Sequence, residues 1–271
     1  MKSYFDLKGR VYIITGGAGL LGYKYAEAIL ESNGIPVLFD INPKVKTCAY
    51  ELSNKYGKEV EGIVVDITNE DDVRRSVFEL STKMIIYGLI NNAANNPMMN
   101  KVDDQRLRLE DFSLEVWNKD FSVCVTGAFL MSKYVGPLLV KHGGGVIINI
   151  LSDLGVIAPD QRLYIKDGEN TETQSVKPVT YSVAKHALLG LSKYLSTYWS
   201  HKGVRVNAVS PGGVYTGTND PEFVRRLNSL IPMGRMANSD EYKGTIVYLC
   251  SDASSYMNGA NIIIDGGRSV W

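Results

Sequence analysis

The order of strand-like and helix-like segments is the feature that most restricts the fold of this 271-residue chain. Short apolar runs recur that are continuous rather than alternating, which is typical of strands buried on both faces of a sheet. They cover residues 11–15, 36–40, 62–66, 88–92, 145–151, 204–209 and 260–265. Helix-like segments lie between them, among them residues 20–30, 70–83, 114–141, 181–200 and 240–251. The alternation predicts an α/β fold with a doubly wound, seven-stranded parallel sheet and helices on both faces.

Length and composition favour one soluble domain over residues 1–271, because no change of composition resembles a linker. Acidic and basic residues balance at 29 each, so nucleic acid and anionic membrane are not expected as partners. Cys48, Cys124 and Cys250 lie far apart, which predicts neither a disulfide framework nor a metal site. No signal-peptide core is evident, and no apolar run approaches the roughly 20 residues of a membrane span. We therefore expect a cytoplasmic protein.

The segment "TGGAGLLG" (15–22) connects the first predicted strand to the first predicted helix. A glycine turn there presents backbone N–H groups and a helix N-terminus, which together bind a pyrophosphate. Gly16, Gly19 and Gly22 suit this role because a Cβ would obstruct the turn and the approach of the phosphates. A tight turn without a ligand would look similar from the glycines alone.

Asp40 supports the reading as a dinucleotide site, because it ends the next predicted strand. A carboxylate at that point can accept hydrogen bonds from both adenosine ribose hydroxyls. It would repel a 2′-phosphate, and no Arg or Lys lies in the glycine turn or directly after Asp40. The sequence therefore predicts NAD as cofactor in preference to NADP.

The segment "YSVAK" (181–185) places Tyr181 and Lys185 one helical turn apart on the same face. A phenol, whose unperturbed pKa is about 10, is a poor base at neutral pH. An adjacent ammonium favours the phenolate and lowers the pKa of the phenol toward the working range. Ser152 follows a predicted strand, where ligands of such sheets gather, and could hold the substrate oxygen.

Taken together, these segments resemble the short-chain dehydrogenase/reductase family, single-domain branch, over essentially the whole chain. The matching segments, in family order, are the glycine turn, Asp40, "VVDIT" with Asp66, "NNAA" (91–94), Ser152, "YSVAK", "VNAVSPGGVYT" (206–216) and "IIIDGG" (262–267). The resemblance implies a single-domain Rossmann fold and an NAD-dependent oxidoreductase.

The resemblance also implies roles for individual residues. Ser152, Tyr181 and Lys185 would be catalytic: Tyr181 would exchange the proton, Ser152 would orient the substrate oxygen, and Lys185 would also bind the nicotinamide ribose. Asp66 and Ile67 would flank adenine. The implied cofactor contacts are Gly16, Gly19, Leu21, Gly22, Asp40, Asp66, Ile67, Asn92, Ala93, Tyr181, Lys185, Pro211, Gly212, Val214 and Thr216.

Two positions depart from the family pattern. The glycine turn has the spacing T-G-x-x-G-x-x-G of the longer sugar-nucleotide branch, which leaves a sugar-nucleotide epimerase or dehydratase as an alternative. Cys124, in "VCVTG" (123–127), replaces the asparagine that the family uses in proton relay. A thiol donates weakly, so the relay must use water or another group, and Cys124 is interpreted as core filler. Cys124 is also a weak argument for a protein that senses NAD without turnover, which the retained catalytic trio opposes.

The chain between Ser152 and Tyr181 is longer than the family's usual dozen residues. We expect an insertion at about 159–178, either a surface excursion or a segment that is mobile when the site is empty and orders over it as a lid. Its composition is polar, and its Arg162, Lys166 and Lys177 could meet a phosphate or carboxylate. Ser152, Arg162 and Tyr181 are therefore the predicted substrate contacts, and a sugar-like substrate is favoured.

A narrower resemblance concerns "SDLGVIAPDQRLY" and "VKPVTYSVAKHALLGLSKYL". These segments are similar to oxidoreductases of bacterial flagellin or surface-glycan modification, which supply precursors of nonulosonic acids. A homotetramer or homodimer is also expected, because the helices at 114–141 and 181–200 carry more apolar surface than one sheet can bury. The side chains concerned are Val125, Phe129, Tyr134, Leu188, Leu191, Tyr194, Leu195 and Trp199.

Overall fold

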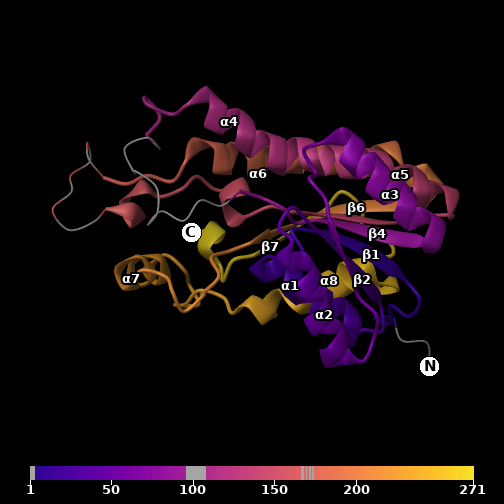
Figure 1. Cartoon of the computed structure of the whole chain (residues 1–271). Helices are drawn as coiled ribbons and strands as arrows, with labels where there is room; N and C mark the ends of the chain where they lie inside the picture. Colours follow the sequence, from indigo (N-terminus) through magenta and orange to yellow (C-terminus); the bar gives the residue numbers. More distant parts are fainter. Residues whose placement is uncertain (1–3, 96–107, 166–167, 169, 171, 173) are drawn as a thin grey trace.

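The computed structural model describes residues 4–95, 108–165, 168, 170, 172 and 174–271. Its strands form one parallel sheet in the order β3-β2-β1-β4-β5-β6-β7 (Figure 1). The strands are β1 Val11–Thr15, β2 Ile35–Asp40, β3 Glu61–Val64, β4 Ile86–Asn91, β5 Gly145–Ile150, β6 Val204–Pro211 and β7 Asn261–Ile264. Strand order reverses between β1 and β4, and ligands of such sheets bind where the order reverses.

Helices cover both faces of the sheet, which confirms the predicted doubly wound fold (Figure 1). One layer contains α3 Glu70–Lys83, α4 Leu114–Phe121, α5 Gly127–Lys141 and α6 Val179–Tyr198; the other contains α1 Leu20–Glu31, α2 Lys44–Tyr56 and α8 Lys243–Cys250. Helix α7, Pro221–Ser229, lies beside the carboxyl ends of the strands. Neither α2 nor α7 has a counterpart among the helices named from the sequence.

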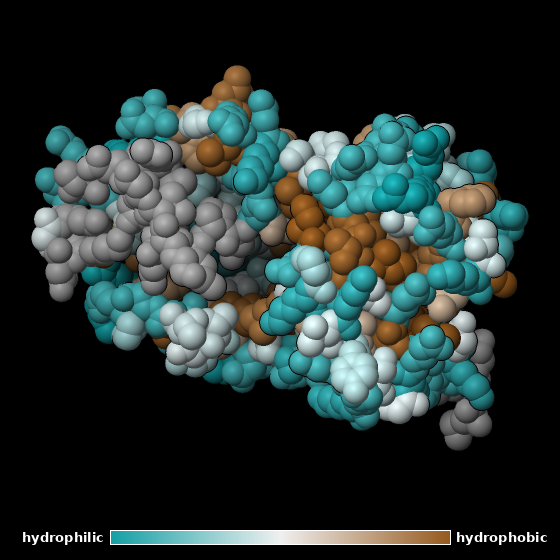
Figure 2. All heavy atoms as spheres, in the orientation of Figure 1, coloured by the Kyte–Doolittle hydropathy of each residue, from teal (hydrophilic) through white to brown (hydrophobic). Residues whose placement is uncertain are grey.

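Each face of the sheet has its own hydrophobic core. Ile14, Leu38 and Ile148 pack toward α1, α2 and α8, whereas Ile13, Val37 and Ile147 pack toward α3, α5 and α6. On the face drawn in Figure 2, hydrophilic residues cover the outer sides of the two helix layers and a hydrophobic area lies between them. This distribution follows from amphipathic helices that turn their apolar sides toward the sheet.

The predicted helix at 114–141 is interrupted. A π-helical turn, Ser122–Thr126, separates α4 from α5, and π-helical turns inside α-helices are frequent at functional sites. Contrary to the expectation from the sequence, the stretch Leu114–Lys141 is long and apolar enough, by length and composition, to cross a membrane. About half of its apolar window is buried, and α5 packs against β4 and α3, so its composition matches that of a core helix.

Candidate active site

A cavity of about 1020 Å³ opens at the carboxyl ends of the strands. Its walls come from the ends of β1, β2, β4, β5 and β6, the start of α6, helix α7 and part of the insertion. All of the predicted cofactor contacts except Gly22 line it. Ser152 and Lys177 also line it, as does Arg268 near the carboxyl end of the chain. A cavity of this size accommodates a dinucleotide together with a small substrate.

The glycine turn between β1 and α1 is shaped to bring backbone close to a ligand. Gly16 has φ +66°, a conformation that favours glycine, and its carbonyl accepts the Gly19 N–H at 3.0 Å. A Cβ on Gly22 would collide with the Gly16 carbonyl oxygen, so Gly22 is needed to close the turn although it does not line the cavity. The backbone cradle at the start of α1 therefore has a shape that fits a pyrophosphate.

Hydrogen bonds join the ends of β1 and β4 beside this turn. Thr15 Oγ1 accepts hydrogen bonds from the backbone N–H groups of Asn92 and Ala93 at 3.0 and 3.1 Å. The Asn92 amide donates to the Thr15 carbonyl oxygen at 3.0 Å. These bonds give the strand-order reversal a fixed shape and place Asn92 and Ala93 in the cavity wall.

Asp40 lies at the end of β2 and lines the cavity. Its Oδ2 accepts the Ala18 N–H at 3.0 Å and its Oδ1 accepts the Asn42 N–H at 2.9 Å. A carboxylate offers about four lone-pair sites, so about two remain for ribose hydroxyls. Asp66 and Ile67 line the same part of the cavity in the loop after β3, which ends at Val64, two residues earlier than predicted.

Tyr181 and Lys185 both line the cavity from the first turns of α6. Lys185 is almost fully buried, and its Nζ donates to the Ile150 carbonyl oxygen at 2.8 Å. The same nitrogen lies 5.8 Å from the centre of the Tyr181 ring. The structure thus places the Lys185 ammonium beside the Tyr181 ring.

Ser152 completes the predicted trio from the end of β5, and its hydrogen bonds restrict its role. Its Oγ donates to Asp153 Oδ1 at 2.8 Å and accepts the Leu154 N–H at 3.2 Å. Because the hydroxyl proton is directed to Asp153, the Ser152 hydroxyl must turn toward the cavity before it can donate to a substrate oxygen.

A buried ion pair behind Ser152 was missed by the sequence reasoning. Arg268 Nη1 lies 2.7 Å from Asp153 Oδ2, and the two side chains are only 8% and 5% exposed. Asp153 adjoins Ser152, but Arg268 is 115 residues further along the chain, and no sequence signal links the two. The pair joins the C-terminal turn to the loop after β5 and holds the carboxylate to which Ser152 donates.

The described part of the insertion forms a wall of the cavity. Leu163 is buried against Leu227 of α7, and the Tyr164 ring lies 5.6 Å, centre to centre, from that of Phe223. Arg226 of α7 donates to the Ile165 carbonyl oxygen. The described part of the insertion and α7 lie side by side at one end of the molecule (Figure 1). Leu163 and Tyr164 line the cavity there.

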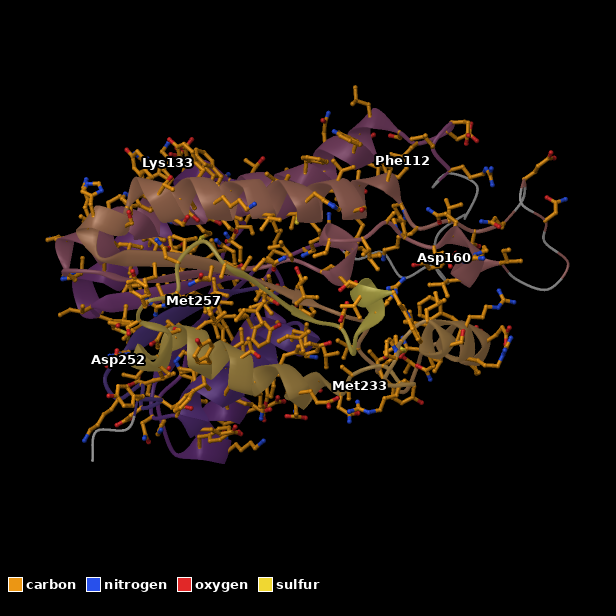
Figure 3. All side chains as sticks on the ribbon, turned by 180° about the vertical axis from the view of Figure 1, so that it is seen from behind. Phe112, Lys133, Asp160, Met233, Asp252 and Met257 are labelled. Carbon is orange, nitrogen blue, oxygen red and sulfur yellow. The ribbon has the colours of Figure 1, made fainter. Side chains whose placement is uncertain are left out.

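The three basic residues proposed for the insertion have different outcomes. Arg162 does not line the cavity: its side chain is 82% exposed and pairs with Asp160 at 2.7 Å. Figure 3 shows Asp160 on the insertion, across the molecule from Lys133 of α5. Lys177 does line the cavity, with its Nζ 4.0 Å from the centre of the Tyr181 ring. Lys166 lies outside the described residues.

Burial lowers the pKa of Lys177 to about 8. The nearby Asp153 carboxylate opposes this shift and the Lys185 ammonium adds to it. In the same region, burial raises the pKa of the Cys124 thiol, which keeps the thiol protonated. Among the described residues, no group of three or more His, Cys, Asp or Glu side chains is placed to hold a metal ion.

Comparisons with known proteins agree with this geometry. A sequence model described as "short chain dehydrogenase" matches residues 10–164, and one described as "Enoyl-(Acyl carrier protein) reductase" matches residues 169–269. The chain therefore belongs to the short-chain dehydrogenase family. An NAD-dependent glycerol dehydrogenase of Listeria innocua is 28% identical over 270 residues, which are 98% of this chain and 96% of that protein.

Two solved structures show the same fold with different cofactors. A gluconate 5-dehydrogenase of Burkholderia cenocepacia, in complex with NADP and tartrate, has a TM-score of 0.86 and 26% identity over 99% of this chain and 98% of that chain. A short chain dehydrogenase of Leptospira borgpetersenii with bound NAD⁺ has a TM-score of 0.81 and 29% identity over 99% and 96%. These relatives support an oxidoreductase of sugar-like or polyol substrates. One of the two solved structures holds NADP and the other holds NAD⁺.

Proposed function

We propose that the protein is an NAD-dependent oxidoreductase that interconverts a hydroxyl and a keto group on a carbohydrate-like substrate. The observation that carries the proposal is the convergence of Ser152, Tyr181 and Lys185 on one cavity that also contains the glycine cradle. The comparisons with sugar and polyol dehydrogenases support the same class of substrate.

The chain's own groups divide the chemistry. In the oxidative direction, the Ser152 hydroxyl turns from Asp153 to donate to the substrate oxygen and fixes its position, which leaves the substrate's one hydroxyl proton for Tyr181. Tyr181, as phenolate, takes the hydroxyl proton, and the Lys185 ammonium stabilises that phenolate. A nicotinamide, when bound, supplies the hydride chemistry. Lys185 would also hold the nicotinamide ribose, and Pro211, Gly212, Val214 and Thr216 would hold the nicotinamide side of the cofactor.

NAD is proposed as the preferred cofactor because Asp40 would lie beside the adenosine ribose of a bound dinucleotide. A 2′-phosphate would meet a carboxylate that is already fixed by the Ala18 and Asn42 N–H groups. Like charges at hydrogen-bond distance oppose binding.

The substrate is proposed to carry a carboxylate or phosphate, which Lys177 would meet inside the cavity. Arg162, directed to Asp160, is less suited to this role than the sequence indicated. A place in bacterial surface-glycan or flagellin-glycan precursor synthesis is proposed on the resemblance of the segments around Asp153 and Tyr181. Closure of residues 159–178 over the substrate remains part of this proposal.

A cytoplasmic homodimer or homotetramer is also proposed. Leu188, Leu195 and Trp199 are buried within the chain itself and are not available to a partner. Phe129 and Tyr194, on α5 and α6, are 47% and 62% exposed and provide apolar surface for a second copy. A monomeric mass by light scattering at micromolar concentration would contradict this part of the proposal.

The test is turnover with NAD on glycerol, xylitol, D-gluconate, aminosugars, sugar phosphates and nucleotide sugars. Reduced nicotinamide is followed by its ultraviolet absorbance and products by mass spectrometry. Net formation of reduced cofactor with a keto product supports the proposal. Conversion of a nucleotide sugar without net change in the cofactor would favour an epimerase or dehydratase instead. Tight NAD binding with no product from any member would favour an NAD sensor.

A further inference from the structure

A second, smaller cavity lies directly behind the catalytic pair. Its volume is about 10 Å³, and its walls include Tyr181 and Lys185 together with Asp120, Cys124 and Thr180. About one water molecule fits a space of this order, provided that the space offers two to four polar partners. The residues of the wall whose side chains carry such partners are Lys185, Asp120 and Asn95.

Asp120 is held in place at the end of α4. The Thr180 hydroxyl donates to its Oδ2 at 2.5 Å, and the Asn95 amide donates to its Oδ1 at 3.2 Å. Thr180 is fully buried and directly precedes Tyr181 on α6, whereas Asp120 is partly exposed. The Asp120 carboxylate is therefore bonded to the catalytic helix, although the residue as a whole is partly exposed.

Cys124 cannot take over the hydrogen bonds of the asparagine usual in this family. Its thiol lies in the π-helical turn, is only 5% exposed, and is flanked by the charges of Asp120 and Lys185. A thiol is a weak donor and a weak acceptor, so it provides little support for a water on the path from Lys185 to solvent. The stronger acceptor beside the same cavity is Asp120.

We infer that Asp120 takes the place of the missing asparagine in a proton relay. The relay runs from Tyr181 and Lys185 through one water in the small cavity, and Asp120 is its last group before solvent. The inference rests on the proposed function, because it concerns the proton that alcohol oxidation leaves on Tyr181.

The relay is balanced and moves no electrons. Lys185 gives a proton to the cavity water as it takes the proton of the Tyr181 phenol. The water passes a proton to the Asp120 carboxylate, and the carboxylic acid releases it to solvent. Tyr181 ends as phenolate, Lys185 as ammonium and Asp120 as carboxylate, ready for the next substrate. Asp120 acts only through these groups and is a positioning and relay residue.

The decisive variant is Asp120→Asn, which keeps the shape of the side chain but cannot accept a proton. Groups that exchange a proton directly with the substrate contribute about 10²–10⁴-fold in rate. Asp120 is the last group of the relay, so we expect Asp120→Asn to lower kcat by at least about tenfold. The solvent deuterium isotope effect on kcat should rise, and KM and NAD affinity by calorimetry should stay unchanged. Glu115→Gln, an exposed carboxylate on the same helix, is the matched control and should leave all four quantities unchanged.

A rescue distinguishes a relay from a merely structural role. Adding Cys124→Asn to Asp120→Asn should restore part of kcat and lower the isotope effect, because the family's usual group returns to the cavity. Wild-type kcat and isotope effect in Asp120→Asn would overturn the inference. So would a loss of kcat accompanied by weaker NAD binding or a lower melting temperature, with no rescue.

A measurement without turnover separates this inference from the proposed function. A crystal structure with NAD should show an ordered water within hydrogen-bond distance of both Lys185 Nζ and an Asp120 oxygen. A dry cavity would overturn the relay even if the enzyme oxidises a polyol. If the ordered water is present but no substrate in the panel reacts, the function fails while the hydrogen-bonded path is supported.

Discussion

Lys177 offers a sharp test of the proposed anionic substrate, because burial lowers its pKa to about 8. With that pKa, the ammonium form falls from about 90% of molecules at pH 7 to about 10% at pH 9. The sign follows directly: the positive charge is present below pH 8 and is lost as the pH rises. If Lys177 meets a carboxylate, kcat/KM for an acid substrate should fall about tenfold between pH 7 and pH 9 for this reason.

The assay compares D-gluconate with xylitol in the same buffers. Any ionisation that affects both substrates equally cancels in the ratio of their kcat/KM values, so the ratio isolates the charge at Lys177. Lys177→Met keeps an unbranched side chain but removes the titratable charge. The variant should make the ratio independent of pH, mainly through a higher KM for gluconate. Lys202→Met, a change of an exposed lysine that does not line the cavity, is the control. A ratio in the wild-type protein that does not vary with pH would refute the reasoning.

Three further predictions concern proton exchange at Tyr181, cofactor preference at Asp40 and the buried ion pair of Arg268. Tyr181→Phe should lower kcat by about 10²–10⁴-fold and leave NAD binding intact; retention of more than a tenth of the activity would mean that another group exchanges the proton. Asp40→Ala should reduce the preference for NAD(H) over NADP(H) in titration calorimetry, and equal affinities in the wild-type protein would contradict the assignment. Arg268→Met leaves a buried carboxylate without its partner and should lower the free energy of unfolding by about 3–5 kcal/mol in urea. The double variant Asp153→Asn/Arg268→Met should recover part of that loss, and a loss as large as in the single variant would show that the ion pair is not the cause.

The sequence by itself determined the fold class and most of the cavity. Seven continuous apolar runs separated by helical segments are enough to specify a doubly wound sheet. The reason is that the pattern of apolar residues within each element shows which of its faces are buried. The site residues were also recognisable, since they follow strand ends or open helices. All predicted cofactor contacts but Gly22 line the cavity, together with Ser152, Tyr181 and Lys185.

Only the tertiary structure decided which polar groups support that site. Arg162 and Lys177 are both basic residues of the same insertion, yet Arg162 is directed to Asp160 and Lys177 faces the cavity. Arg268 and Asp153 meet across 115 residues of chain. Asp120 and Thr180 approach only because α4 packs against α6. Periodicity records which face of an element is buried, but partner choice depends on contacts between elements that are distant in sequence, and no local pattern records those contacts.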